Sequence, residues 1–422
     1  MFFGKTKKQK KTQHAISLDI GTEFVKALIF RIEGGKGYVV GTGRARQRLS
    51  DMQGGTVTDI AGVIGNCEIA LKQAVDQAGV LPKQVIIGIA GELVKGMTTH
   101  VRYVRSNSRQ KIGMDELQDI VTQVQKKALE KAKSALAWET GHKEIDVRLV
   151  NSAVVEVRID GYRVTNPIGF YGRDVSVGVF NSFAPIVHLG ALQTIAEELG
   201  LDLISIAAEP YAVSRCLGTE ESVDFSAVFI DVGGGTTDVA VVRNGGVEGT
   251  KMFAIGGRSF TKRAANILSL NFNEAEEAKL RYSRGDMEGE SKNELEKSFR
   301  GDCEVWQAGV ELALEDFVQN VKTGEQELLP TRILLCGGGS MLPNIPEVLK
   351  TTKWSKSLPF PSTPKIEFIL PKDIVSIVDE TNTLKDQQDV TPMALANLAL
   401  DFSDDNGVVG NILDKVTEGL KV

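Results

Sequence analysis

Three glycine-rich turns, each placed directly after an apolar run, hold the residue types best suited to chemistry. They are Asp19-Ile20-Gly21-Thr22, Asp231-Val232-Gly233-Gly234-Gly235-Thr236-Thr237-Asp238 and Cys336-Gly337-Gly338-Gly339-Ser340. Glycine lets a backbone pass close to a bulky anion and turn its N–H groups toward it. The hydroxyls of Thr22, Thr236 and Thr237 add further donors. Any one of these sequences is typical of an ordinary turn, but the three together predict a polyphosphate site.

Two carboxylates accompany these turns. Asp19 and Asp231 end the apolar runs, so both are expected to face one cleft, where a hard cation such as Mg²⁺ binds, usually through water. The pattern G-x-x-x-x-G-K-[ST] does not occur, and Gly4-Lys5-Thr6 lacks the strand and the first glycine of that loop. The phosphates are therefore expected to bind between hairpins.

The segments that carry the first two turns form a repeat. Ala15–Asp19 and Val25–Ile32 are β-branched, apolar runs on either side of the first turn, and Phe225–Asp231 and Asp238–Val242 flank the second. The offset of 212 residues between the two turns is half of the 422-residue chain. This spacing predicts duplicated α/β halves and a two-lobed molecule.

The remaining pattern supplies the elements around these hairpins. A helix is expected over Ile60–Gly79, and a buried strand over Gln84–Ala90. A small inserted unit follows, with strands at Thr98–Arg105, Ile145–Ile159 and Val175–Phe183, a helix at Asp115–Ala135 and a hairpin turn at Asp160-Gly161, before the helix Ile186–Gly200. Ser283–Asn293 is expected to be a loop, and Pro343–Pro371 to be mostly loop around a short helix.

Composition excludes several classes of protein. Hydrophobic residues make up 42% and charged residues 25%, which is typical of a soluble globular chain with more than one domain. A net charge of -6 argues against a general nucleic-acid binder. Four scattered cysteines and four histidines, without C-x-x-C, argue against a structural zinc site. No apolar run approaches the ~20 residues that span a bilayer, and no cleavable signal is apparent, so a cytoplasmic location is expected.

These motifs resemble those of the actin-like ATPases over about residues 15 to 402. Asp19–Lys26 looks like the first phosphate hairpin, Asp231–Asp238 like the second, and Ile333–Ser340 like the adenosine loop. Within that superfamily the chain is most similar to the FtsA and PilM branch, with FtsA the closer. The segments that carry this likeness are Val85–Gly91, Asp160-Gly161 with Asn166–Gly169, Ala208–Ala212 and Ala275–Lys279.

The resemblance implies a two-lobed actin-like (ribonuclease H-like) α/β fold with a small α+β insert in the first lobe. The expected boundaries are a basic tail at 1–13, first-lobe core at 14–91, the insert at 92–183 and first-lobe core again at 184–206. The second lobe is expected at 207–386, with a helical subdomain at about 258–330, then a return to the first lobe at 387–403 and an amphipathic tail at 404–422.

The resemblance also assigns roles to residues. The phosphates of ATP would be held by Gly21, Thr22, Gly233, Gly234, Gly235, Thr236 and Thr237. The nucleoside would be held by Glu276, Lys279, Gly337, Gly338 and Gly339. Mg²⁺ would lie between Asp19 and Asp231. Glu209 would orient an attacking water, or is simply the carboxylate at a helix start before Pro210. Lys26 would reach a phosphate, or covers a strand edge. The expected activity is at most a weak Mg²⁺-dependent ATPase.

One departure from the family pattern bears on hydrolysis. Thr261 is followed by Lys262 and Arg263, where related chains carry an acid two residues after the threonine. A cation near the cleft would disfavour hydrolysis and would leave ATP as a clamp between the lobes.

The two ends of the chain suggest membrane contact. Met1–Lys11 joins two phenylalanines to five lysines, which suits an anionic lipid surface or a solvated tail. Gly407–Val422 has one apolar face if helical, with Ile412, Leu413 and Val416 on it, and would bind membrane, a partner or the protein's own surface.

The FtsA resemblance implies a self-associating division scaffold that binds the C-terminal tail of the tubulin-like protein FtsZ through its second lobe and lies on the inner face of the membrane. The PilM resemblance implies instead a pilus-assembly protein that binds the cytoplasmic tail of an inner-membrane pilus protein. A sugar kinase of the same superfamily is a third interpretation. No nucleic-acid partner is expected.

Overall fold

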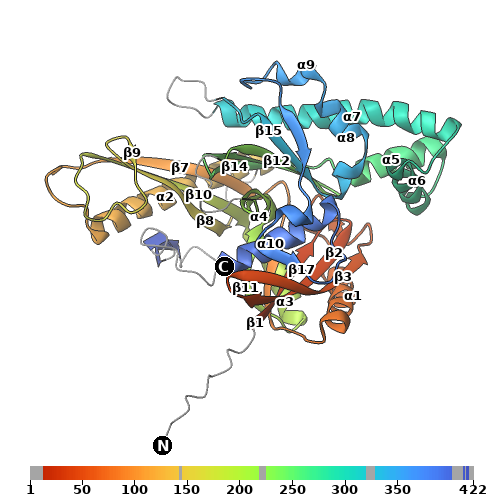
Figure 1. Ribbon diagram of the computed structural model, residues 1–422, viewed down its shortest axis with the longest axis horizontal. Helices are drawn as coiled ribbons and strands as arrows, with labels where there is room; N and C mark the ends of the chain where they lie inside the picture. The colour runs from red at the N-terminus through yellow and green to blue at the C-terminus, as the bar shows by residue number, and fades with distance from the viewer. Residues whose placement is uncertain are drawn as a thin grey trace, which may run out of the picture.

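The computed structural model describes residues 13–141, 145–217, 225–319, 328–401, 412–413 and 415–417. Two β-sheets form the centres of two lobes, stacked one above the other in Figure 1. The first lobe holds a six-stranded sheet of order β11-β6-β1-β2-β3-β17. Its strands are β1 (Gln13–Ile20), β2 (Phe24–Glu33), β3 (Lys36–Arg46), β6 (Gln84–Ile89), β11 (Asp202–Ala208) and β17 (Ile377–Asp379).

The second lobe is organised around a nine-stranded sheet of order β16-β15-β12-β13-β14-β7-β10-β8-β9. Its strands are β7 (Lys95–Val104), β8 (Val147–Ile159), β9 (Tyr162–Arg163), β10 (Asp174–Pro185), β12 (Ala227–Val232), β13 (Thr237–Arg243), β14 (Gly246–Phe253), β15 (Arg332–Cys336) and β16 (Lys365–Phe368). A separate ribbon, β4 (Met52–Gln53) with β5 (Thr56–Val57), belongs to the first lobe.

Strand pairing confirms the predicted repeat. In the first lobe, β1 pairs antiparallel with β2 and parallel with β6. In the second, β12 pairs antiparallel with β13 and parallel with β15. The carboxylates occupy equivalent register positions, because Asp19 lies opposite Lys26 and Asp231 lies opposite Asp238. Both turns therefore leave their sheets at the same place.

Helices cover the sheets, and those predicted over Ile60–Gly79, Asp115–Ala135 and Ile186–Gly200 are among them. The helices are α1 (Ile60–Ala78), α2 (Met114–Thr140), α3 (Ile186–Glu198), α4 (Glu209–Arg215), α5 (Gly257–Leu268), α6 (Phe272–Arg284), α7 (Glu290–Gln319), α8 (Asn344–Leu349), α9 (Thr352–Ser355) and α10 (Val390–Asp401). The expected loop over 283–293 shrinks to the few residues between α6 and α7. The proline-rich stretch holds α8, α9 and β16 rather than one short helix.

Two large apolar cores hold these layers together. The first joins the first lobe to one face of the second-lobe sheet, where Phe229 and Leu334 pack with residues of α4 and α10. The second lies between the other face of that sheet and the helices α5 to α8, and contains Trp306 and Phe299, both fully buried. Because the first core includes residues of both lobes, the lobes are packed against each other.

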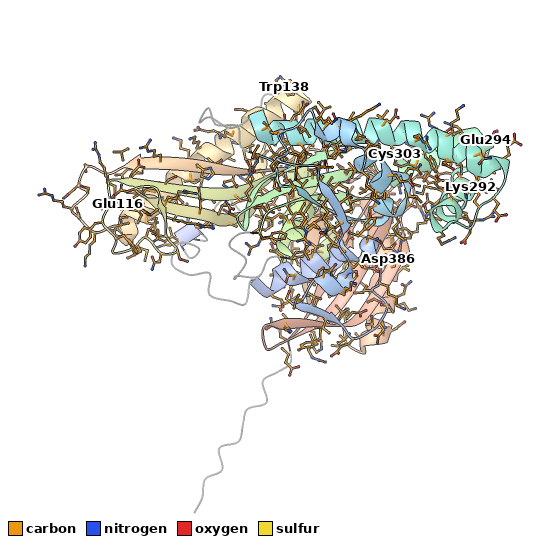
Figure 2. All side chains as sticks on the ribbon, turned by 45° about the horizontal axis from the view of Figure 1, so that its top comes forward. Glu116, Trp138, Lys292, Glu294, Cys303 and Asp386 are labelled. Carbon is orange, nitrogen blue, oxygen red and sulfur yellow. The ribbon has the colours of Figure 1, made fainter. Side chains whose placement is uncertain are left out.

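The inserted unit extends the second-lobe sheet, although the chain enters it from β6 and leaves it into α3, both in the first lobe. Strand β7 pairs with β14 through Gly249↔Met97 and Thr250↔Gly96. Glycine permits this approach, since a Cβ on Gly96 would lie 2.2 Å from Thr250 Oγ1. Helix α2 covers one face of the insert, and Glu116 and Trp138 in Figure 2 mark its two ends.

The C-terminal tail is described only at 412–413 and 415–417, which are helical. Ile412 and Leu413 are buried in the apolar core of the insert, with Val416 packed against it. The rest of the 407–422 segment and all of 1–11 lie outside the described residues. Within the described parts of the chain, none of the helices combines the length and the apolar character that a bilayer crossing requires.

Candidate functional site

The two glycine hairpins approach each other between the lobes. In each, the first glycine donates its N–H to a carbonyl at or just before the start of the next strand, from Gly21 to Phe24 O (3.1 Å) and from Gly233 to Thr236 O (2.9 Å). A Cβ on Gly234 would lie 2.7 Å from Glu23 Cβ. The turns are therefore in contact, and glycine is required for that contact.

A cavity of about 440 Å³ opens beside the two turns. It is lined by most of the residues that the sequence singled out: Asp19, Gly21, Thr22, Lys26, Glu209, Asp231, Gly233, Gly234, Thr236, Glu276, Lys279, Gly337, Gly338 and Gly339. Asp386, which also lines it, is labelled in Figure 2 at the junction of the lobes. The duplicated halves thus share one crevice, as the repeat predicts.

Gly235 and Thr237 lie outside this lining. Thr237 is fully buried. Its hydroxyl donates to Ile255 O (2.6 Å) and accepts from Trp306 Nε1 (2.9 Å). Gly235 packs on the opposite hairpin, because a Cβ there would lie 2.7 Å from Thr22 Oγ1. Both residues therefore shape the hairpin, and neither lines the cavity in which the phosphates were expected.

Four carboxyl groups gather at the base of the cavity: Asp19, Glu209, Asp231 and Asp238. Burial, the charge of Asp19 and then that of Asp238 raise the pKa of Glu209 well above its ordinary value. Burial and then Asp231 do the same to the pKa of Asp238. Burial also raises the pKa of Asp231, while a bond from Thr391 Oγ1 (2.6 Å) opposes the rise.

These carboxyl groups fit a hydrated cation. Glu209 Oε1 and Asp238 Oδ1 are buried and lack hydrogen-bond partners, and an unpartnered buried acceptor is costly unless a donor or a cation satisfies it. Among the residues that the structure describes, no three His, Cys, Asp or Glu side chains converge closely enough to hold a metal ion by themselves. Mg²⁺ would thus need phosphate oxygens or water to complete its shell.

Lys26 connects the first hairpin to the second half of the chain. Its Nζ donates to Gln388 O (2.6 Å), in η3 (Gln387–Asp389), and lies 3.2 Å from Asp19 Oδ2. Lys26 lies on β2, between β1 and β3, so it does not cover a strand edge, and its place in the cavity lining leaves the phosphate contact as a prediction. Glu209 begins α4 with Pro210 next in the chain. It also lines the cavity, so its helix position does not exclude a role there.

The wall formed by α5 and α6 is tied together by polar contacts. Glu276 accepts from Thr261 Oγ1 and pairs with Lys279 Nζ at 2.8 Å. Lys279 also donates to Gly257 O (3.2 Å). Arg263, in contrast, pairs with Asp302 of α7 (2.7 Å) and does not line the cavity. The cation that replaces the family's acid is therefore kept out of the cleft.

The third glycine loop, Gly337–Gly339, forms another part of the cavity wall. Gly337 has φ +81°, and a Cβ there would lie 2.1 Å from Asp231 Oδ1. Its N–H donates to Gln387 O (3.0 Å). The neighbouring Gly338 begins η1 (Gly338–Met341) and has ordinary space around it, since a Cβ at this position would lie 3.7 Å from Gln388 Cβ. Sterics therefore require glycine at position 337 but not at position 338.

Several lining residues were missed from the sequence. Arg44 stacks on Phe24, with its guanidinium 3.6 Å from the ring centroid. Arg258 pairs with Glu23 (2.7 Å) across the lobes. Asp238 was noted only as the end of a motif, although its position opposite Asp231 in a hairpin was a readable signal. The arginines gave none, since arginine is common on exposed surfaces and neither lies in a glycine-rich turn.

The family model described as "Cell division protein FtsA" matches residues 228–378 of this chain. That segment contains the second hairpin, Glu276, Lys279 and the third glycine loop. Cell division protein FtsA of Enterococcus faecalis is 25% identical over 350 residues, which cover 79% of this chain and 76% of that protein. FtsA of Neisseria meningitidis serogroup B is 29% identical over 351 residues, 78% of this chain and 79% of that protein.

The chain is similar in sequence to the FtsA proteins. The alignments with FtsA are long enough to include parts of both lobes, whereas the family model matches mainly the second lobe and ends within β17. Among solved structures, the PilM–PilN type IV pilus biogenesis complex contains a chain that superposes with a TM-score of 0.62 at 16% identity, covering 92% of this chain and 99% of that one. That likeness shows the two-lobed actin-like fold, and the FtsA relatives are in addition similar in sequence.

Proposed function

We propose that the chain binds ATP with Mg²⁺ between its lobes and acts as an actin-like scaffold in cell division. The observation that carries the proposal is the contact of two glycine hairpins over one cavity that also holds unpartnered carboxylates. Main-chain N–H groups at such turns suit phosphate oxygens. The FtsA relatives support the division role.

In this proposal the chain's residues divide the nucleotide between them. The turns at Gly21 and Gly233–Thr236 bind phosphates, and Lys26 adds a fixed positive charge beside them. Glu276, Lys279 and the loop Gly337–Gly339 hold the nucleoside. When bound, Mg²⁺ would neutralise the phosphate charge beside Asp19 and Asp231. Glu209, whose Oε1 lacks a partner, would orient a water molecule. The proposed activity is at most a weak ATPase.

The division role has two further parts. The second lobe would bind the C-terminal tail of FtsZ, and the ends of the chain, 1–11 and 407–422, would attach the complex to the inner face of an anionic membrane, with self-association as an added property. The packing of Ile412 and Leu413 in the insert supports the alternative that the tail docks on the protein's own surface. C-terminal membrane attachment would then require the tail to leave that core.

Nucleotide binding is tested by titrating a fluorescent ATP analogue with and without Mg²⁺. Asp231→Ala and Gly234→Val are expected to abolish binding, because the first removes a carboxylate and the second forces the hairpins apart. Gly190→Ala, on α3 with open space around it, is the folded control and should bind as the parent does. Equal affinities for ATP in all four proteins would refute the site.

The partner is tested by fluorescence anisotropy with a labelled FtsZ tail peptide, a scrambled version and the pilus-protein tail. Saturable binding of the FtsZ tail alone supports the division role. Saturable binding of the pilus tail alone would replace it with the PilM-like role, which the likeness in fold motivates. Turnover of a small hydroxylated substrate would revive the sugar-kinase interpretation.

A further inference from the structure

A second cavity lies between the lobes and shares the Glu23–Arg258 pair with the nucleotide cavity. Its volume is about 750 Å³, within the range of small-molecule sites. The first lobe contributes Glu23, Arg46, Arg48 and Leu49, and the second contributes Arg258 and Phe272. A molecule bound here would contact both lobes.

The charges of this cavity favour an anion. Three arginines line it against one carboxylate, Glu23. Glu23 is already shared, since Oε1 pairs with Arg46 Nε and Oε2 with Arg258 Nε, each at 2.7 Å. Arg48 is exposed, and its backbone N–H donates to Asp51 Oδ2 (2.8 Å). Guanidinium groups bind carboxylate and phosphate oxygens through paired N–H bonds.

Arg258 gives an independent indication of a ligand. The residue is 9% exposed, and its Nη1 donates to Met52 O at 3.1 Å. Its Nη2 is buried and lacks a hydrogen-bond partner. A buried donor without an acceptor is costly. Arg258 lines this cavity, so an oxyanion that reaches Nη2 from it would satisfy that donor.

The segment that follows Arg46, the last residue of β3, and carries Arg48 is held by hydrogen bonds without a ligand. Asn66 of α1 donates from Nδ2 to Gln47 Oε1 (2.6 Å) and to Asp51 Oδ2 (2.9 Å). Asp51 is fully buried. Beside the arginines, Leu49 is 52% exposed and Phe272 is half-buried, which adds an apolar surface. The site is thus pre-organised, polar on one side and apolar on the other.

We propose that this cavity binds a small ligand that carries a phosphate or carboxylate group, and that the ligand strengthens nucleotide binding. The coupling follows from shared residues, because Glu23 and Arg258 line both cavities. A ligand that contacts Arg48 and Arg258 holds the lobes in the arrangement that the nucleotide also contacts. By linkage this gain is reciprocal, so the nucleotide raises the affinity for the ligand by the same factor. This second part rests on the proposed nucleotide site, whereas anion binding does not.

The test uses inorganic phosphate and citrate as probes in isothermal titration calorimetry on the full chain, at constant ionic strength. Saturable binding is expected, with a loss of at least tenfold in affinity for Arg48→Glu. Arg109→Glu, an exposed arginine in the insert that lines neither cavity, should leave the affinity unchanged. Because Arg48 does not line the nucleotide cavity, the comparison separates the two sites.

The titration is repeated with the nucleotide cavity saturated by a non-hydrolysable ATP analogue. The probe's affinity should then rise about fivefold or more, and Arg48→Glu should cancel the rise. Equal probe affinity in Arg48→Glu and Arg109→Glu, or no saturable binding of either probe, would overturn the site. Probe binding that an ATP analogue leaves unchanged overturns the coupling alone. Failure of the analogue to bind refutes the nucleotide site without touching the anion result.

Discussion

Asp238 occupies in the second hairpin the register position that Lys26 occupies in the first. The ammonium of Lys26 lies 3.2 Å from Asp19, so the first carboxylate is neutralised within the chain. In the second hairpin a carboxylate faces Asp231 instead, and the pKa of both groups rises, with burial as the largest cause. The repeat is therefore symmetric in backbone and asymmetric in charge, so the proposed cation would lie beside the carboxylates of the second lobe, which no lysine on the paired strand neutralises.

Asp238→Asn is expected to weaken the Mg²⁺ dependence of ATP binding. The amide keeps the shape of the side chain and removes one of the two facing negative charges, so less cation is needed. The ratio of ATP affinities with Mg²⁺ and with EDTA should fall severalfold. Glu156→Gln, a carboxylate on the insert outside the cavity, is the matched control and should leave the ratio unchanged. A ratio that stays the same in Asp238→Asn would contradict this role.

Glu209→Gln is expected to stabilise the nucleotide-free protein, and the gain should grow with pH. The unfolded glutamate loses its proton near its ordinary pKa of 4.5, whereas burial raises the pKa of the folded one well above that. Between these two pKa values the folded state holds a proton that the unfolded state has lost, so the stability of the folded state falls as pH rises. At pH 7 the variant should be more stable by about 1–3 kcal/mol in urea unfolding. Near pH 4 the two proteins should unfold alike, and a constant difference would exclude Glu209 as its source.

Gly337→Ala and Gly338→Ala are expected to differ in ATP affinity, because only the first introduces a steric clash. The first places a methyl group 2.1 Å from Asp231 Oδ1 at a φ of +81°, and the second only reaches 3.7 Å from Gln388 Cβ. We expect Gly337→Ala to lose at least tenfold in ATP affinity, since either Asp231 or the loop must shift, and Gly338→Ala to bind nearly as the parent does. Fluorescent-nucleotide titration distinguishes them. Equal losses would mean that the loop does not depend on this contact.

Gly43→Ala and Gly65→Ala should change stability in opposite directions. A Cβ on Gly43 in β3 would lie 1.8 Å from Ala70 O of α1, so strand and helix must separate. Overpacking of this kind costs about 1–3 kcal/mol. Gly65 lies within α1 with open space around it, and alanine there should stabilise the helix by about 0.5–1 kcal/mol. Chemical denaturation of both variants measures the pair, and destabilisation by Gly65→Ala would contradict the open space at that position.

Deletion of 407–422 should loosen the insert, whereas deletion of 1–11 should not. Ile412 and Leu413 are 6% and 2% exposed within the insert's core, so their loss uncovers α2 and β10. Hydrogen exchange of the backbone amides in these two elements should accelerate in the C-terminal deletion only. Vesicle pelleting of the same proteins, and of the double deletion, measures membrane attachment. Equal pelleting of the double deletion and the full chain would rule out both ends as anchors.

The sequence predicted the local features of the fold and site well. Each hairpin is encoded by a few adjacent residues, such as Asp160-Gly161, whose φ values of 48° and 86° match the expected tight turn. The glycines that gather at the cavity follow from strand ends and the 212-residue repeat. The membership of a strand in one sheet or another was less accessible, because β7 joins β14 through only two residue pairs. Nothing local to Thr237 indicated that Trp306 would engage its hydroxyl.

The pairing of β7 with β14 also affects how the molecule would move. Strand pairing ties the insert to the second lobe, while its two covalent connections run into the first. A rotation of one lobe against the other would carry the insert along as a lever arm and swing its far tip through the widest arc. The segments where the insert meets β6 and α3 would serve as the pivot. A change in the angle between the lobes on nucleotide binding would therefore produce its largest displacement at the tip of the insert, at one end of the molecule's longest dimension (Figure 1).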